Sequence, residues 1–221
     1  FFDFCEKDAS QAEAVFILGD LFEYWVGDDA ASHSPFQHEV KQALSNLSSK
    51  VKTYYIHGNR DFLLGSTFLK KTGMTLLADP SLVEIAGSKY LLAHGDALCT
   101  DDVQYQTFRT QVRNAKWQTE FLGQSLAARK AQIEALRMQS EQAKSNKSMS
   151  IMDVNEEAVA RLVQDYQHPS LFIHGHTHRP AVHELKVDSH LCKRIVLGDW
   201  YEQGSCLRLD QTGFRNIPIK M

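Results

Sequence analysis

The chain has 221 residues, of which 43% are hydrophobic and 23% charged, as in an ordinary globular protein with one full core. Its net charge of −3 argues against a general nucleic-acid-binding protein, and no apolar run approaches the length needed to span a bilayer. Four widely spaced cysteines form no CxxC, which excludes a zinc ribbon or a dithiol redox motif and is typical of reduced cytoplasmic thiols.

Short apolar runs and helical segments alternate through the first ninety residues. The predicted elements are, in chain order, the end of a helix (1–13), a strand (14–18), an aromatic loop (21–29), a helix (36–47), a strand (53–56), a short helix (62–71) and a hairpin (82–86 and 89–93). The helix at 36–47 is predicted from one apolar stripe of Phe36, Val40, Leu44 and Leu47.

A long helical segment follows at residues 104–147. It has no proline and one glycine, and its apolar residues recur at helical spacing. Eight cationic and three acidic side chains give it a net charge of +5. We predict an inserted helical cap, basic and apolar together, that lies over the functional site. The alternative is an ordinary solvated helical hairpin.

The last third of the chain returns to strands. Asp153 and Glu156 have the spacing of a capping box, which predicts a helix that continues to about Gln167. Further strands are predicted at 171–173, 182–187, 194–197 and 205–209. This order predicts one α/β domain over residues 1–221, a four-layer α/β/β/α sandwich with the helical cap inserted in it.

Four of the predicted strands end in a glycine and a side chain that can bind metal. These side chains are Asp20, Asn59, His94, His176 and His178. Strand C-termini of an α/β sheet share one edge, where ligands bind, so we expect the five to meet there. His176 and His178 are two residues apart, and on an extended backbone both imidazoles point the same way.

This set contains oxygen and nitrogen donors and no thiolate, which favours Mn, Fe or Zn over a structural zinc site. A carboxylate such as Asp20 can bridge two cations, and a pair of cations clamps phosphoryl oxygens and activates water. A histidine-rich strand end without metal is the simpler alternative, but the same chemistry at four strand ends favours a metal centre.

The GD, GNRD, HGD and GHTH motifs, in this order, resemble the calcineurin-like metallophosphoesterase superfamily. The resemblance implies a two-metal phosphoesterase in which Asp20, Asn59, His94 and His176 complete one site, while Asp20 and His178 contribute to the other. The family pattern begins with a strand that ends in DxH, and nothing similar precedes Gly19. We therefore expect an N-terminal strand to be missing and one metal site to be incomplete.

A closer resemblance covers essentially the whole chain. ILGDLFEYWVGDD, HGDALCTDD, SNKSMSIMDVN and IHGHTHRPAVHEL are similar to the UDP-2,3-diacylglucosamine hydrolase family of lipid A biosynthesis. That family's activity would be hydrolysis of a pyrophosphate to UMP and 2,3-diacylglucosamine 1-phosphate (lipid X), with two Mn²⁺ ions. The implied partners are this nucleotide-lipid substrate and the membrane surface, and the implied location is peripheral, on the cytoplasmic side of a Gram-negative inner membrane.

The same resemblance implies the roles of individual residues. The substrate-binding residues would be Asn59, Arg60, Asp102, Ser140, Lys144, Lys147 and His176, and the catalytic ones Asn59, Arg60, His94 and His176. Arg60 stands where many relatives have a histidine that protonates the leaving group. A sugar 1-phosphate already leaves readily, so a guanidinium that neutralises charge can replace this acid. Turn or capping roles are predicted for Asp96, Asp101, Asp153 and Asp199.

Two other functions fit parts of the sequence. A different binuclear metallophosphoesterase, acting on nucleotides or phosphoproteins, would share the metal-binding residues but lack the basic, apolar cap. A non-catalytic binding module on the same fold would have lost metal ligands, whereas all five are present. Fold alone does not choose between them.

Overall fold

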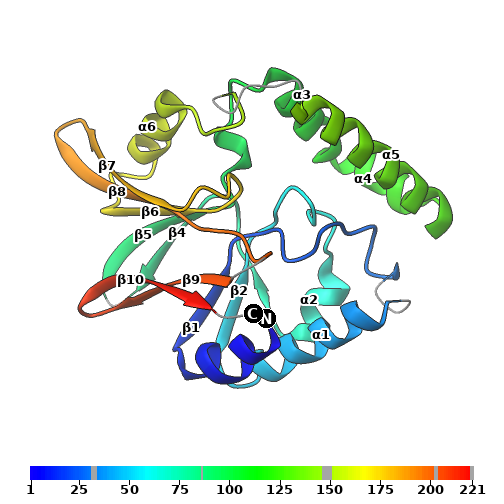
Figure 1. The fold of residues 1–221 in the computed structure, drawn as a ribbon, viewed down its shortest axis with the longest axis horizontal. Coiled ribbons are helices and arrows are strands. Elements are labelled where there is room, and N and C mark those ends of the chain that lie inside the picture. Colours follow the sequence, from blue (N-terminus) through cyan, green and yellow to red (C-terminus); the bar gives the residue numbers. More distant parts are fainter. Residues whose placement is uncertain (31–33, 86, 146–150, 202–203, 220–221) are drawn as a thin grey trace.

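A computed structural model of the chain describes residues 1–30, 34–85, 87–145, 151–201 and 204–219, without the side chains of 143–145. Figure 1 shows two stacked β-layers, with helices α1 (Pro35–Ser48) and α2 (Ser66–Thr72) outside one layer and helix α6 (Glu156–Asp165) outside the other. The predicted α/β/β/α sandwich is confirmed.

The β-layers contain three groups of paired strands. The bounds are β1 (Ala14–Ile17), β2 (Lys52–Tyr55), β3 (Thr75–Leu76), β4 (Ser81–Ile85), β5 (Ser88–Ala93), β6 (Leu171–His174), β7 (Ala181–Val187), β8 (His190–Val196), β9 (Gly204–Asp210) and β10 (Gly213–Ile219). Their orders are β1-β2-β3, β4-β5-β6-β8-β7 and β9-β10. The sequence missed β3, which has only two residues, and β10, whose Pro218 argues against a strand.

The helices begin and end at local signals in the sequence. Ser34 caps α1 by accepting a hydrogen bond from the backbone N–H of Gln37 (3.3 Å), and α2 ends at Gly73, whose φ is +74°. The first thirteen residues form two short helical turns, Phe4–Asp8 and Ala9–Gln11, which agrees with the predicted helical end.

The predicted capping box at Asp153 is wrong. The N-cap of α6 is Asn155, whose Oδ1 accepts a hydrogen bond from the N–H of Ala158 (3.0 Å). The carboxylate of Asp153 is engaged elsewhere, because it accepts hydrogen bonds from the N–H of Val154 and from the guanidinium of Arg179. The helix therefore begins at Glu156 itself, whereas the predicted capping box placed Glu156 later in the first turn.

The segment predicted as a cap folds into three helices, α3 (Val103–Val112), α4 (Ala115–Leu122) and α5 (Leu126–Ser145). Figure 1 shows them grouped together to one side of the stacked sheets. Across the described part of the chain, the structure shows no helix that combines the length and the apolar character needed to span a membrane.

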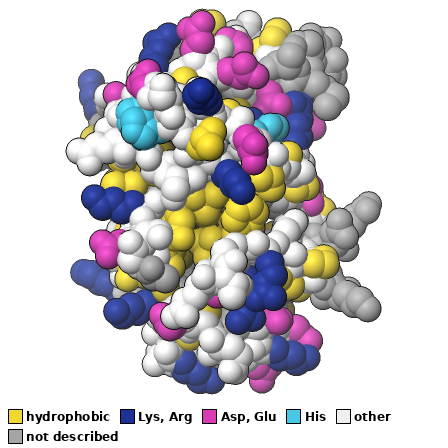
Figure 2. Space-filling model, turned by 90° about the vertical axis from the view of Figure 1, so that its left-hand side faces the viewer, with side chains coloured by type: hydrophobic (Ala, Val, Ile, Leu, Met, Phe, Trp, Pro, Cys, Tyr) yellow, Lys and Arg dark blue, Asp and Glu magenta, His cyan; other side chains and the backbone are white. Residues whose placement is uncertain are grey.

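The core lies between and outside the two layers. Leu18, Ile56, Leu92, Ile173 and Ile195 fill the space between the sheets, and Val40, Leu44 and Leu47 of α1 are buried on the outer side. Phe36, placed on the same predicted stripe, is exposed. Figure 2 looks onto the left-hand side of Figure 1 and shows hydrophobic side chains gathered in a hollow at the centre of that face.

Candidate metal centre

Strand pairing brings the predicted ligands together. Strands β1 and β2 are parallel and pair as far as Ile17 and Tyr55, so the loops that follow them leave the sheet at the same edge. The same holds for the parallel strands β5 and β6, which pair as far as Ala93 and His174. The two pairs of loops also touch each other, because Nδ1 of His94 lies 2.7 Å from the carbonyl oxygen of Leu18.

Four of the five predicted metal ligands meet there. Nε2 of His94 lies 2.9 Å, and Nδ1 of His176 2.8 Å, from Oδ1 of Asn59. Asp20, His94 and His176 each offer one ligand atom, and these three atoms lie within 4.8 Å of one another. His94 is buried, while Asp20 and His176 are half-buried, so the cluster remains open to a ligand.

The hydrogen bonds of His94 test whether this cluster fits a cation. In a neutral ring, Nδ1 donates to Leu18 and Nε2 carries a lone pair. That lone pair faces Oδ1 of Asn59 and, at 3.8 Å, Oδ2 of Asp20, which are also acceptors. Such a group of acceptors is favourable around a shared cation, either a ring proton or a metal ion. The carboxylate, amide oxygen and imidazoles are suitable ligands for a divalent metal.

The electrostatics of His94 agree with this need for positive charge. Burial lowers the pKa of the His94 imidazole, but the carboxylates of Asp20 and Asp96 raise it, and the net result is a pKa above the ordinary value. The surroundings of His94 therefore favour a cation at Nε2.

Two glycines allow the loops after β1 and β2 to lie in contact. A Cβ on Gly19 would come within 2.5 Å of Cα of Gly58, and a Cβ on Gly58 would overlap the carboxylate of Asp20. Gly19 also has a φ of +85°, which side chains disfavour. Glycine at both positions is therefore what lets Asp20 lie beside Asn59.

Asp61, the last residue of the GNRD motif, holds the same two loops together. Its buried carboxylate accepts hydrogen bonds from the N–H groups of Asp20 (3.2 Å), Leu21 (2.6 Å) and Phe22 (3.3 Å) in one loop, and from that of Gly58 (3.0 Å) in the other. Burial and the nearby Asp20 raise the pKa of Asp61 to about 6. No role was predicted for Asp61, and its place in the motif was the available signal.

The GHTH loop is not extended, contrary to the prediction. His176 and His178 have φ values of +66° and +54°, so the alternation expected of a strand does not apply. The ring of His176 points to Asn59, whereas Nδ1 of His178 lies 3.7 Å from Oδ2 of Asp199. Burial and Arg60 lower the pKa of His178, while Asp199 and Asp20 oppose them. His178 is thus near the cluster but outside its closest group.

The guanidinium of Arg60 borders the cluster. Its Nε lies 3.6 Å from Oδ2 of Asp20, and its Nη1 donates to the carboxylate of Glu23 and to the hydroxyl of Tyr201 (2.6 Å). The side chain is 25% exposed. Burial lowers the pKa of Arg60, and Asp20 and Glu23 more than offset that effect. A permanent positive charge therefore lies beside the proposed metal ligands.

Helix α3 is anchored to the loop that carries His94. The buried carboxylate of Asp96 accepts hydrogen bonds from the hydroxyl of Tyr105 (2.7 Å) and from Nε of Arg109 (2.8 Å). Asp96 begins a short 3₁₀ turn, Asp96–Leu98, in agreement with the predicted turn role, but its side chain also joins two parts of the fold. Sequence spacing could not show that Tyr105 and Arg109 would supply its partners.

Further contacts attach the helical segment to the site and to the body of the protein. Nη2 of Arg113 donates to the carbonyl oxygen of Gly58 (2.9 Å), and the ring of Tyr105 stacks on that of His176 with centroids 6.0 Å apart. On α5, the buried guanidinium of Arg129 pairs with the carboxylate of Asp29. Arg109, Arg113 and Arg129 are thus engaged in anchoring this segment.

The remaining predicted substrate-binding residues are spread more widely. Asp102 is buried and caps α3 by accepting a hydrogen bond from the N–H of Tyr105 (3.0 Å), while Ser140 lies exposed on α5. The side chain of Lys144 and the whole of Lys147 lie outside the described residues.

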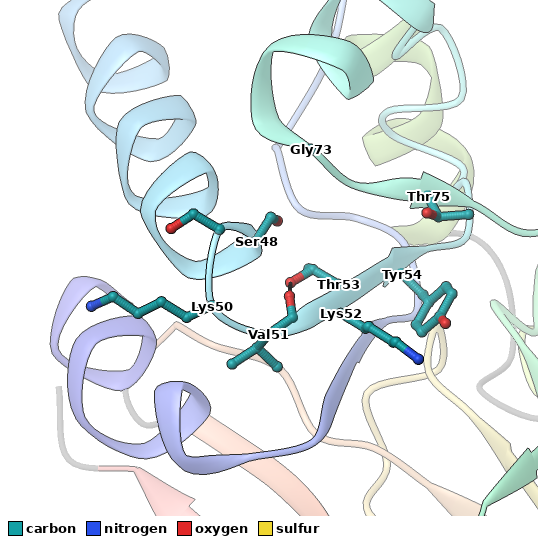
Figure 3. Close-up of a pocket in the computed structure, with 9 residues that line it drawn as sticks. Ser48, Lys50, Val51, Lys52, Thr53, Tyr54, Gly73 and Thr75 are labelled. Carbon is teal, nitrogen blue, oxygen red and sulfur yellow. Dashed lines mark hydrogen bonds between the residues drawn. The ribbon is translucent and has the colours of Figure 1, made fainter.

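A pocket of about 420 Å³ lies at the opposite end of β2 from Asn59. Figure 3 shows Ser48 and Lys50 from the end of α1 and the following turn, with Lys52 and Thr53 at the start of β2. Its lining has two lysines but no carboxylate or imidazole, so it does not share the chemistry of the metal-ligand cluster.

Comparison with known proteins supports a phosphoesterase. Residues 1–180 match the family model of calcineurin-like phosphoesterases. Three relatives are named UDP-2,3-diacylglucosamine hydrolase. The Aromatoleum aromaticum protein is 48% identical over 96% of this chain and 86% of its own length. The Aeromonas hydrophila protein is 49% identical over 92% and 84%, and the Escherichia coli protein 46% identical over 95% and 86%.

These likenesses extend over most of the chain and include the loops that carry the cluster. The match to the family model alone covers Asp20, Asn59, His94, His176 and His178. The chain therefore belongs to the calcineurin-like phosphoesterases, a family of metal-dependent hydrolases, and within it to the UDP-2,3-diacylglucosamine hydrolases.

Proposed function

We propose that this protein hydrolyses the pyrophosphate bond of UDP-2,3-diacylglucosamine and releases UMP and 2,3-diacylglucosamine 1-phosphate in lipid A biosynthesis. The observation that carries the proposal is the Asp20–Asn59–His94–His176 cluster with the guanidinium of Arg60 beside Asp20. Metal ligands next to a permanent cation suit a substrate with two linked phosphoryl groups. The names of relatives that are 45–49% identical support this choice of substrate.

We assign the divalent metal to Asp20, Asn59, His94 and His176, with His178 as a ligand of a second ion, and we propose manganese. Bound there, the metal supplies Lewis-acid stabilisation of phosphoryl oxygens and activation of water. The chain's own contribution is to fix the metal ligands before binding: the Leu18 carbonyl orients the ring of His94, and Asp61 holds the loops that carry Asp20 and Asn59.

Arg60 serves the leaving group in this proposal. A sugar 1-phosphate departs as a stable anion, so the site needs positive charge near it rather than a proton donor. The guanidinium keeps its charge at any working pH and can bind two phosphate oxygens at once. Its 3.6 Å approach to Asp20 puts that charge at the edge of the metal-ligand cluster.

We propose that the cap, helices α3–α5, binds the acyl chains. Its buried side chains pack against the core, so only exposed ones can contact the substrate. Val112 and Phe121 are buried in the core and hold the cap in place, and Trp117 stacks on Phe121 with centroids 5.0 Å apart. Phe108 and Leu122 are 36% and 41% exposed. Together with the more exposed Val103 and Met138, they remain available for acyl chains or for a membrane surface. Because the substrate is a lipid, we propose that the protein works at the cytoplasmic side of the inner membrane.

The direct test measures release of UMP from UDP-2,3-diacylglucosamine in the presence of Mn²⁺, with UDP-glucose as the matched substrate that lacks acyl chains. We expect much faster turnover of the lipid substrate. Equal turnover of both would favour a general nucleotide phosphoesterase, and no turnover of either would favour a binding module.

Asp20→Ala tests the metal assignment in the same assay. Loss of hydrolysis together with loss of bound manganese in a folded variant is the expected result. Retention of normal activity and metal content by this variant would show that Asp20 is not a ligand.

A further inference from the structure

We infer that Glu23 and Tyr201 are positioning residues that orient the guanidinium of Arg60 toward the substrate phosphate. The inference rests on the proposed pyrophosphate hydrolysis and adds two residues that had no predicted role. Glu23 lies in the loop after β1 and Tyr201 beyond the end of β8, 178 positions apart. Their meeting at Arg60 is therefore a product of the tertiary fold.

Arg60, Glu23 and Tyr201 form a closed group of three. Nη1 of Arg60 donates to the carboxylate of Glu23 and to the hydroxyl of Tyr201, and that hydroxyl donates to Oε1 of Glu23 at 2.9 Å. Each side chain therefore contacts the other two. A closed group restricts the rotation of a long arginine side chain more than one ion pair does, and this ordering precedes substrate binding.

The same contacts leave one side of the guanidinium available. Nη1 is occupied by Glu23 and Tyr201, and Nε faces Asp20 at 3.6 Å. Within the described part of the chain, neither a hydrogen bond nor an ion pair involves Nη2 of Arg60. A guanidinium has five N–H donors in a rigid fork, so the donors on Nη2 remain for an oxygen of the bound phosphate.

Glu23 also competes with Asp20 for the guanidinium of Arg60, whose Nε already lies 3.6 Å from Oδ2 of Asp20. Without it, the nearest anion to Arg60 is Asp20, which we assign as a metal ligand. A full ion pair between Arg60 and Asp20 would remove the arginine from the phosphate and draw the carboxylate away from the metal. The Glu23 carboxylate, 51% exposed, holds Arg60 from the opposite side.

A second arginine faces the same carboxylate. Nη2 of Arg137, on α5, lies 3.9 Å from Oε2 of Glu23, and its guanidinium lies over the ring of Tyr24, 5.4 Å from the centroid. Among the described residues, Arg60 and Arg137 are the two cations that lie close to Glu23. Glu23 therefore offsets part of their mutual repulsion and keeps Arg60 beside the cluster.

The test is a double-mutant cycle on steady-state hydrolysis of UDP-2,3-diacylglucosamine, with Arg60→Ala, Glu23→Gln and the double variant. We expect Glu23→Gln to lower kcat/KM by about tenfold in the wild-type background and to change nothing further when Arg60 is absent. Glu23→Asp should recover part of the loss, and Tyr201→Phe should show a smaller loss that also depends on Arg60. Glu157→Gln is the control, because Glu157 pairs with the exposed Arg161 on α6, away from the cap and the metal-ligand cluster.

Equal losses from Glu23→Gln with and without Arg60 would show a merely structural role, and unchanged or increased activity would also overturn the inference. Hydrolysis by the wild-type protein tests the proposed function separately from the roles of Glu23 and Tyr201. If it does not hydrolyse the lipid substrate, the same cycle is read from calorimetric binding of inorganic phosphate, where Glu23 should again act only through Arg60.

Discussion

Gly19 and Gly58 lie backbone against backbone, and this contact sets the separation of Asp20 from Asn59. A Cβ on Gly19 would be 2.5 Å from Cα of Gly58, closer than real Cβ contacts. The neighbouring loops carry the carboxylate and the amide oxygen of the proposed metal site. The two glycines are thus required by the site, and their replacement gives a sharp test.

Gly58→Ala should separate the two loops and weaken manganese binding at least tenfold, because the new Cβ would overlap the carboxylate of Asp20. The backbone of Gly58 does not need a positive φ, so the effect is one of space alone. Calorimetric titration with Mn²⁺ measures it. Gly198→Ala is the matched control, since its Cβ would meet its nearest atom at 3.4 Å, an ordinary contact. Equal affinities in the two variants would contradict the argument.

Asp61→Asn should destabilise the protein by about 1–3 kcal/mol, because an amide group would replace an acceptor that serves four backbone N–H groups. Metal affinity should fall as well, since those hydrogen bonds hold the Asp20 and Asn59 loops together. Denaturant unfolding and Mn²⁺ titration check the two effects. Asp165→Asn, at an exposed position of α6, should change neither quantity. A stable Asp61→Asn variant with normal metal affinity would show that Asp61 does not hold the two loops together.

Arg60→Ala should lower the rate by about a hundredfold, equivalent to roughly 3 kcal/mol, because the site loses a fixed charge beside the leaving phosphate. Arg60→Lys should retain part of the activity, since it keeps the charge but not the fork. Steady-state kinetics on the lipid substrate measure both. Higher activity in Arg60→His would indicate general-acid catalysis instead.

The Asp29–Arg129 pair should make the attachment of α5 sensitive to acid. The hydrogen bond from Arg129 lowers the pKa of Asp29 below its ordinary value, although burial opposes it. A carboxyl with a lowered folded-state pKa stabilises the fold above its unfolded pKa of about 4, and this contribution is lost as the pH falls through the folded value. The protection of the α5 amides against hydrogen exchange, taken relative to the intrinsic rate at each pH, should therefore fall below about pH 4.

The control for the acid effect is Asp29→Asn, which removes the titrating group. Its α5 amides should exchange faster than those of the wild type at neutral pH, and their protection should change less as the pH falls. Identical pH profiles for the two proteins would show that the pair does not hold the helix.

Phe121 and Phe108 should separate the packing role of the cap from its proposed role in binding. Phe121→Ala should cost about 3–5 kcal/mol of stability because the side chain is buried. Phe108→Ala, at an exposed position, should leave stability within about 0.5 kcal/mol and raise KM for the diacyl substrate but not for UDP-glucose. A Phe108→Ala variant with unchanged KM for both would place the acyl chains elsewhere.

The sequence by itself determined the layered α/β fold and the group of side chains at the strand ends. Both depend on local pattern: an apolar run predicts a buried strand, and the residue after its last position lies at the sheet edge. Asp20, Asn59, His94 and His176 follow from this pattern alone. The helical character of the cap followed likewise from periodicity.

Only the tertiary structure decided how the polar side chains pair. Asp96 lies in a turn, and its anchoring of α3 depends on the position of Arg109. The group of Arg60, Glu23 and Tyr201 joins loops more than a hundred positions apart. His178 departs from His176 because both have positive φ values, which no alternation of residues predicts. Local pattern reports backbone shape and burial, whereas partners across loops are set by packing between distant segments.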